Sequence, residues 1–157
     1  MNFTQILDSY FKILKIILTG LIFLLTIPVF LQIVSRYVAF VPRYIWTEEV
    51  ARFAFVWIIL VGSTIAVREN THFSVDIFSK LSESSENVIR ILQIVLIFLF
   101  AVVFFVGGIQ FAQFGAIQRS SLAGLPMITI FIAWPLAGLS WIFFLIEQFL
   151  DSRTENE

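Results

Sequence analysis

The sequence predicts an all-α integral membrane protein with four transmembrane helices and short amphipathic helices at the membrane interface. Of its 157 residues, 59% are hydrophobic and only 13% are charged, whereas soluble domains carry about 25% charged residues. The mean hydropathy is +0.96. Four largely apolar runs are long enough to cross a membrane, whose hydrocarbon core is about 30 Å thick. We expect residues 1–157 to form a single membrane domain.

The composition also excludes several classes of function. There is no cysteine, which rules out disulfides, thiolate metal sites and a catalytic thiol. The formal net charge is −1, so nothing favours nucleic acid as a partner. The first apolar run is too long for a cleaved signal, and we expect it to be retained.

The first span is expected at about residues 16–35. Before it, residues 3–14 place apolar side chains at the i, i+3, i+4, i+7 spacing of an amphipathic helix. This segment either lies in the interface or leads directly into the span. Arg36 and Tyr37 mark the far interface.

The second span is expected at about residues 47–67 and begins with charged residues. Thr47 suits an N-cap, and the helix dipole favours Glu48 and Glu49 in the first turn. Glu48 and Arg52 are four residues apart and can pair. Since the uncharged part of this run is short for a crossing, these charges must lie at or just inside the interface.

The second half of the chain predicts an interfacial helix and two more spans. The interfacial helix is expected at about 71–81, the third span at about 90–115, and the fourth at about 126–147, followed by a polar tail that begins at Glu147. Residues 119–126 predict a tight turn. In the third span Gly108, Ala112 and Ala116 recur every four residues. Such spacing lets helix backbones approach closely.

Basic residues near the span ends favour one orientation. With the N-terminus inside, six basic residues lie on the cytoplasmic side and four on the other. The positive-inside rule therefore predicts that both termini are cytoplasmic.

Chemistry that several transporter and enzyme classes require is missing. No ionisable group is expected at mid-membrane, which counts against a proton-coupled exporter of four spans. The only histidine, His72, lies outside the spans, so a haem-bearing anchor lacks its ligands. His72 and Asp76 are four apart, but two ligands make a weak metal site, and a surface contact is favoured. We therefore expect no cofactor, no metal and no enzymatic activity.

Charged and small residues around the second span resemble a known family. The residues that carry the resemblance are Arg36, Tyr37, Trp46, Thr47, Glu48, Glu49, Arg52, Trp57, Gly62, Ala66, Arg68, His72 and Asp76. As a set they resemble the small membrane subunit of tripartite ATP-independent periplasmic (TRAP) transporters, the DctQ type. The dense match covers residues 36–76, and the rest agrees in length and in the number of spans.

The resemblance implies a partner and a role. In that family a large membrane subunit carries substrate and sodium ions in the bacterial inner membrane. A periplasmic binding protein delivers the substrate, typically an organic acid such as a C4-dicarboxylate or sialic acid. The small subunit is expected to brace the large one. The subunit-interface and anchor residues would be Arg36, Trp46, Glu48, Glu49, Arg52, Gly62, Arg68, His72 and Asp76.

Two other classes of function remain as alternatives. A homo-oligomeric four-helix channel or small transporter would need a polar lining, for which Gln110 and Gln113 are the candidates. Such amides more often hydrogen-bond a neighbouring helix. A membrane anchor for a redox enzyme is disfavoured by the single histidine.

Overall fold

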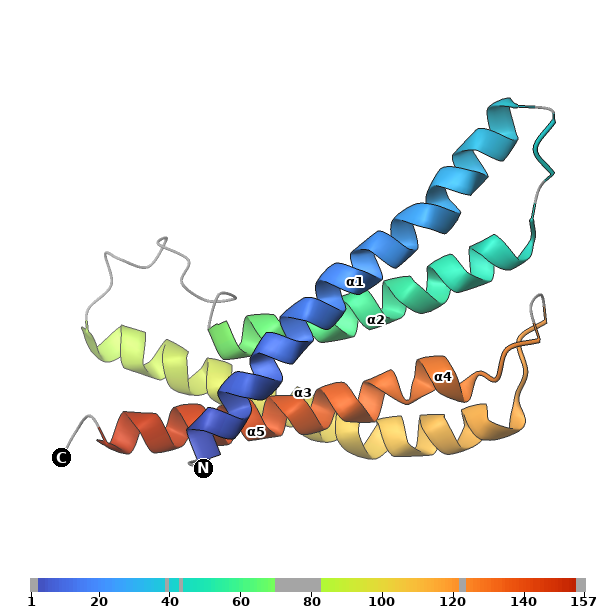
Figure 1. The fold of residues 1–157 in the computed structure, drawn as a ribbon. Coiled ribbons are helices and arrows are strands. Elements are labelled where there is room, and N and C mark those ends of the chain that lie inside the picture. Colours follow the sequence, from blue (N-terminus) through green and yellow to red (C-terminus); the bar gives the residue numbers. More distant parts are fainter. Residues whose placement is uncertain (1–2, 39, 43, 70–82, 122–123, 155–157) are drawn as a thin grey trace.

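Apolar helical runs dominate the structure. The computed structural model describes residues 3–38, 40–42, 44–69, 83–121 and 124–154. Its helices are α1 (Phe3–Tyr37), α2 (Trp46–Glu69), α3 (Glu83–Ile117), α4 (Ile128–Phe131) and α5 (Ala133–Thr154), drawn in Figure 1. Within the described residues, four helices are long and apolar enough to cross a membrane, namely Thr4–Tyr37, Trp46–Glu69, Ile91–Ile117 and Ile128–Phe149. The all-α membrane fold predicted from composition is therefore confirmed.

α1 decides between the two interpretations of the N-terminal segment. The amphipathic start and the first span form one continuous helix of 35 residues that also passes through Pro28. At about 1.5 Å per residue this helix is roughly 50 Å long, well beyond the hydrocarbon thickness. α1 must therefore tilt or extend past the membrane core. The predicted interfacial helix at 71–81 lies outside the described residues.

The fourth span is interrupted near a proline. α4 ends at Phe131 and α5 begins at Ala133, with Ile132 between them in a helical conformation. Pro135 stands in the first turn of α5, where a missing N–H is tolerated. The neighbouring bond from the Leu136 N–H to the Ile132 carbonyl is long, at 3.4 Å. Beyond the break, α5 continues to Thr154. The described part of the predicted polar tail is therefore helical.

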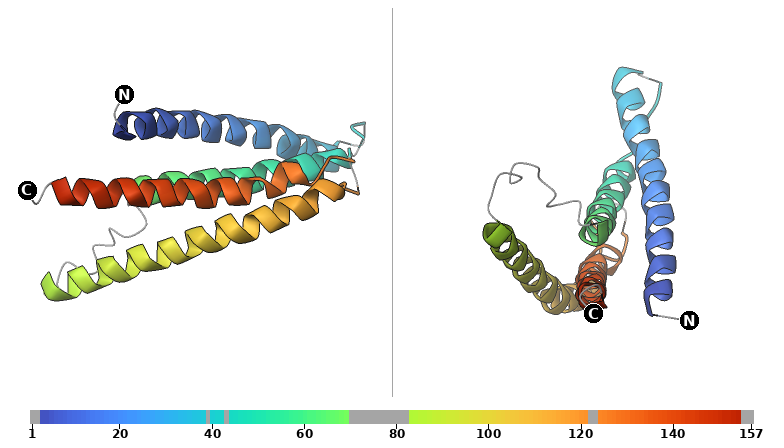
Figure 2. Two further views of the ribbon diagram at one scale, coloured as in Figure 1. Left: turned by 90° about the horizontal axis from the view of Figure 1, so that it is seen from below. Right: turned by 90° about the vertical axis from the view of Figure 1, so that its left-hand side faces the viewer.

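The helices form an open array rather than a closed bundle. α5 packs against α3 and α2, and α1 packs along α2. Viewed along the array, α1 and α3 lie at its two edges (Figure 2). The start of α1 and the end of α5 lie at the same end of the array, which we call the Arg68 end (Figure 1). The opposite end, where α2 begins, we call the Glu49 end.

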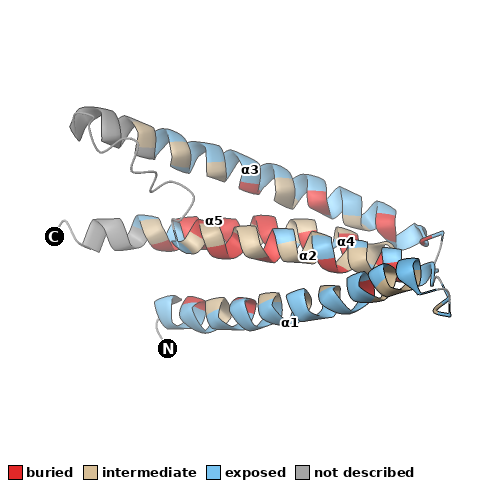
Figure 3. Cartoon of the chain, turned by 90° about the horizontal axis from the view of Figure 1, so that it is seen from above, coloured by how far each residue is buried: buried red, intermediate tan, exposed pale blue. Residues whose placement is uncertain are grey.

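The core lies between the two central helices. Buried positions concentrate on α2 and α5, whereas α1 and α3 are mostly exposed (Figure 3). The core includes Leu60, Val61 and Ile65 of α2, Ala101 of α3, and Ala133, Ala137, Trp141 and Phe144 of α5. The exposed surfaces of α1 and α3 remain apolar, as lipid or a protein partner requires.

Glycines set the close approach of α3 to α5. A Cβ on Gly108 would lie 2.6 Å from the Pro135 backbone nitrogen, and one on Gly138 would lie 2.5 Å from the Phe105 nitrogen. Gly115 is buried against the Phe131 ring. Of the predicted small residues, Gly108 is buried, Ala112 is half-buried and Ala116 is exposed. The packed stripe follows Ala101, Gly108 and Gly115, seven residues apart instead of four, as in helices that cross at a shallow angle.

Replacing Gly108 with leucine is expected to destabilise the protein. The new side chain meets backbone atoms of Pro135, which cannot move aside as a flexible side chain would. Overpacking of this kind costs about 1–3 kcal/mol. Thermal unfolding in detergent, followed by tryptophan fluorescence, measures the loss.

The neighbouring glycine supplies the control. Gly107 has no atom within 4 Å of an added Cβ. Gly107→Leu should therefore unfold at the wild-type temperature. Equal stability of the two variants would contradict close packing at Gly108.

Candidate functional site

Arg68 joins three helices at the Arg68 end. Its Nε donates to Oε2 of Glu147 at 3.1 Å, and its Nη2 donates to Oε1 at 2.9 Å, which makes a bidentate pair between α2 and α5. Nη2 also donates to Oδ1 of Asp8 at 2.5 Å, and Nη1 donates to the Leu7 carbonyl at 3.3 Å, both on α1. A planar guanidinium with five donors suits this branched contact. We call this set the Arg68 cluster.

Aromatic rings enclose the Arg68 cluster. The guanidinium carbon lies 4.7 Å from the centre of the Phe11 ring and 5.2 Å from that of Phe144. The side chains of Arg68 and Glu147 are only 13% and 7% exposed. A charge so far from water is tolerated only when it is paired and hydrogen-bonded, and this pair meets both conditions.

Glu147 is a site residue that the sequence analysis missed. The sequence predicts that it stands where the fourth span meets the polar tail, yet it is buried within α5. A signal existed, because an arginine at the end of an apolar span needs a counter-charge, and Glu147 ends the fourth predicted span. Next to it, Gln148 Nε2 donates to the Val67 carbonyl at 2.9 Å. An outer ion pair joins Lys15 to Glu69 at 2.6 Å.

A second polar cluster ties the start of α2 to the connection between α3 and α4. Glu49 is buried and accepts a hydrogen bond from the Ser120 hydroxyl. Ser120 is itself placed by its N–H, which donates to the Leu125 carbonyl at 2.8 Å. Gly124 turns this connection with a φ of +67°, a conformation that glycine adopts without strain. The Thr47 hydroxyl donates to the Tyr44 carbonyl at 2.7 Å. These contacts hold the Glu49 end together.

The two neighbouring carboxylates have different environments. Glu49 points into the protein, whereas Glu48 is exposed. Arg52 is also exposed, and within the described ranges no ion pair joins it to Glu48. Arg36 and Trp46 are exposed at the same end. The sequence predicted one charged cluster here, and the structure divides it into a buried residue and an exposed set.

The remaining predicted residues fall into two groups. Gly62 is half-buried and has open space where a Cβ would stand. His72 and Asp76 lie outside the described residues. In the part of the chain that the structure describes, no three His, Cys, Asp or Glu side chains gather as metal ligands would.

Neutral groups make the interhelical hydrogen bonds between the two ends. Trp57 Nε1 donates to the Thr129 carbonyl at 2.9 Å, and Trp141 Nε1 donates to the Thr64 hydroxyl at 3.1 Å. These bonds join α2 to α4 and to α5. The Tyr10 and Ser140 hydroxyls lie 2.7 Å apart and join α1 to α5. Such bonds position the helices relative to one another, and none of the groups that form them is charged.

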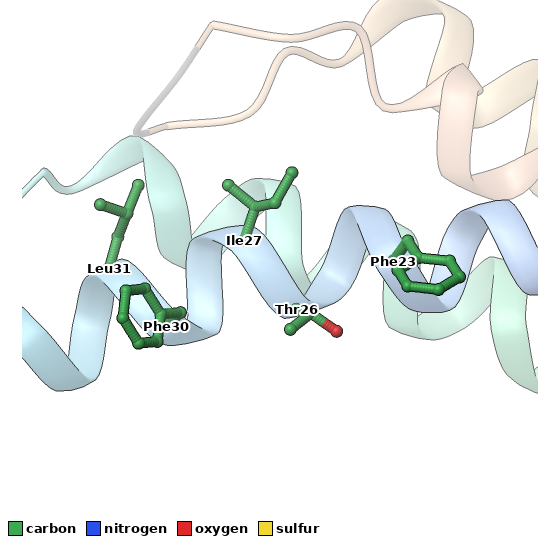
Figure 4. A pocket seen from close by; sticks show the side chains of 5 residues that line it. All are labelled: Phe23, Thr26, Ile27, Phe30 and Leu31. Carbon is green, nitrogen blue, oxygen red and sulfur yellow. The ribbon is translucent and has the colours of Figure 1, made fainter.

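An apolar hollow lies on α1. Its volume is about 390 Å³, and it is lined by Phe23, Thr26, Ile27, Phe30 and Leu31 (Figure 4). The only polar side chain among these, Thr26, donates to the Ile22 carbonyl of its own helix at 2.8 Å. A polar solute would find no compensating group in this hollow, whereas an acyl chain suits it.

The fold and its polar clusters define a class of protein. Four helices long and apolar enough to cross a membrane, with charged contacts at two ends and neutral contacts between them, describe a multi-pass membrane protein. The chain belongs to the family described as "Tripartite ATP-independent periplasmic transporters, DctQ component", whose model matches residues 25–155. It is thus a small membrane subunit of the TRAP type.

Similar proteins carry names of this kind. A TRAP transporter small permease protein of Haemophilus influenzae is 29% identical over 130 residues, which cover 82% of this chain and 80% of the relative. The sialic acid TRAP transporter small permease protein SiaQ of Vibrio cholerae is 27% identical over 154 residues, which cover 89% and 86%.

A longer relative matches only in part. The sialic acid TRAP transporter permease protein SiaT of Haemophilus influenzae is 30% identical over 130 residues, which cover 80% of this chain. The match covers only 20% of that permease, so most of the permease lies outside the matched region.

Removing one member of the Arg68–Glu147 pair is expected to destabilise the protein strongly. Arg68→Met leaves Glu147 buried without its counter-charge, which costs about 3–5 kcal/mol. The double variant Arg68→Met, Glu147→Leu leaves neither charge and should recover most of that loss. Thermal unfolding in detergent checks both. As a control, Glu69→Gln breaks a half-exposed pair and should cost less than about 1 kcal/mol. A double variant as unstable as the single one would refute the pairing.

The two carboxylates at the start of α2 are expected to respond differently to alanine. Glu49→Ala removes a buried carboxylate that accepts a hydrogen bond from the Ser120 hydroxyl, which costs about 1–3 kcal/mol of folding free energy. Glu48→Ala changes an exposed group and should stay within about 0.5 kcal/mol of wild type. Thermal unfolding in detergent measures the stability of both variants. Equal losses of stability would contradict the structure, in which Glu49 is buried and Glu48 is exposed.

Proposed function

We propose that this chain is the non-catalytic scaffold subunit of a sodium-coupled TRAP importer in the bacterial inner membrane. It pairs with a large membrane subunit, which it braces while substrate and sodium ions move through that partner. A periplasmic binding protein contacts the pair transiently and delivers the substrate. Membership of the DctQ family and the names of the relatives support this proposal.

One observation carries the scaffold role. Both buried charged side chains of the described spans are held in structural contacts, Glu147 with the half-buried Arg68 and Glu49 with Ser120. In chains that move ions themselves, ionisable groups that face a cavity inside the membrane typically mark the pathway. The hollow on α1 is instead lined by apolar groups and one threonine. These residues fit a brace, which needs rigid helix contacts and no ion site.

The substrate is an organic acid, and a sialic acid is the leading candidate. Two relatives, at 27% and 30% identity, carry sialic acid in their names. A C4-dicarboxylate is the second candidate. The hollow on α1 is lined by apolar groups and one threonine and offers an acid no charged partner. We assign the choice between the two acids to the binding protein and the large subunit.

The Arg68 end faces the cytoplasm and the Glu49 end faces the periplasm. Six basic residues on the cytoplasmic side against four on the other support this orientation. The start of α1 and the end of α5, which lie at one end of the array, then share the cytoplasmic side (Figure 1). Arg36, Trp46, Glu48 and Arg52 then form an exposed periplasmic set that meets headgroups or partner subunits. His72 and Asp76 would lie on the cytoplasmic side.

The alternative of a homo-oligomeric channel has weaker support. Its candidate lining, Gln110 and Gln113, lies exposed on α3. These two amides alone would line only a short part of a pore across the membrane. No other feature of the described residues favours the channel.

Reconstitution into liposomes tests the scaffold role. This chain alone is expected to move no sialic acid or C4-dicarboxylate. The chain with its large subunit and a loaded binding protein should accumulate the acid under an inward sodium gradient. Omitting this chain should abolish uptake. Uptake by this chain alone would contradict the proposal, as would full uptake without it.

A further inference from the structure

α2 carries a continuous exposed strip along its outer face. The strip consists of Glu48, Arg52, Phe55, Ile59, Gly62 and Ala66, each exposed or half-buried. These positions are spaced alternately four and three residues apart. At 3.6 residues per turn they lie within about 80° of one another around the helix. The buried residues of α2, such as Val61 and Thr64, lie on the opposite face. The central helix of the array therefore leaves one side uncovered.

The α2 strip changes character along its length. It starts at the Glu49 end with two exposed opposite charges, Glu48 and Arg52. Two bulky residues follow, Phe55 and Ile59, which are 54% and 50% exposed. It ends with Gly62 and Ala66, and no atom lies within 4 Å of a Cβ built on Gly62. Along the helix, the strip therefore passes from a charged pair to a bulky apolar pair and then to two small residues.

This pattern fits a helix better than lipid. Alternating four- and three-residue spacing is the geometry in which one helix packs its side chains between those of another. Small residues inside a membrane permit close backbone approach, from which fluid acyl chains gain little. The charged pair at the boundary offers a donor and an acceptor to a polar partner, which fixes the register.

We propose that a transmembrane helix of the large membrane subunit packs along the α2 strip, with its closest approach at Gly62. This inference rests on the proposed function and names the surface through which the two subunits meet. The SiaT relative supports the choice of occupant, because a region similar to this chain is there joined to the longer remainder of a permease. A second copy of this chain and lipid are the competing occupants.

A leucine at Gly62 tests the surface without touching the fold. Because the space around Gly62 is open, Gly62→Leu should leave thermal stability in detergent unchanged. It should lower co-purification of the large subunit with tagged small subunit by roughly tenfold, as overpacking of a close contact does. Gly20→Leu on α1 is the matched control, because its added Cβ also meets nothing within 4 Å, and it should assemble normally.

The outcomes separate this proposal from the proposed function. If the wild-type chain fails to retain the large subunit, both fail. If wild type retains it and Gly62→Leu retains it equally, the strip is not the interface and only the present proposal fails. Loss of assembly in Gly20→Leu with none in Gly62→Leu would likewise overturn it and place the interface on α1.

Photo-crosslinking identifies the occupant. Benzoylphenylalanine is placed at Phe55, or at Phe98 of α3 as a control of similar exposure, at 54% and 51%. In membranes that hold both subunits, the Phe55 probe should give an adduct with the mass of both subunits combined, in higher yield than the Phe98 probe. A dimer of this chain, adducts with lipid alone, or a large-subunit adduct from Phe98 alone would each overturn the proposal.

Discussion

The bidentate pair between Arg68 and Glu147 is the contact on which the arrangement of helices depends. Two opposite charges withdrawn from water attract strongly but lose much hydration energy, so such a pair survives only with full hydrogen bonding. Here the guanidinium meets that demand by also binding Asp8 and the Leu7 carbonyl. One side chain of α2 therefore holds α5 and α1 together. Since α1 otherwise packs mainly along α2, this cluster anchors an edge helix to the core.

Polar contacts at two ends and neutral contacts between them suit a membrane. α2 has 24 residues, so it spans roughly 36 Å, slightly more than the hydrocarbon thickness. Its terminal charged groups, Glu49 and Arg68, thus stand near the two boundaries. In between, the indole groups of Trp57 and Trp141 tie α2 to its neighbours without any charge. A frame of this kind ties the helices together with neutral contacts inside the bilayer, which agrees with the proposed scaffold role.

The open array is itself informative. Two edge helices expose apolar faces, and the central α2 leaves a patterned strip uncovered, as Figures 2 and 3 illustrate. A chain that worked alone would gain stability by closing such an array into a bundle, because each helix would then bury a second face. The uncovered outer faces instead leave room for lipid and, as we propose, for the larger subunit. The matched region within the longer SiaT permease agrees with this reasoning.

The sequence by itself determined the number of helices long and apolar enough to span a membrane, because a hydrocarbon core about 30 Å thick demands long apolar runs that are visible along the chain. It also identified Arg68 and Glu49 as notable, since charges beside apolar runs are rare. Only the tertiary structure decided what they do. Glu147 became the partner of Arg68, 79 residues away along the chain, and Glu49 turned inward while Glu48 stayed outside. Ala116 lies off the packed face and Gly115 on it. Helical periodicity shows which residues share a face, but which face meets a neighbour depends on how the helices cross, and a local pattern does not encode that angle.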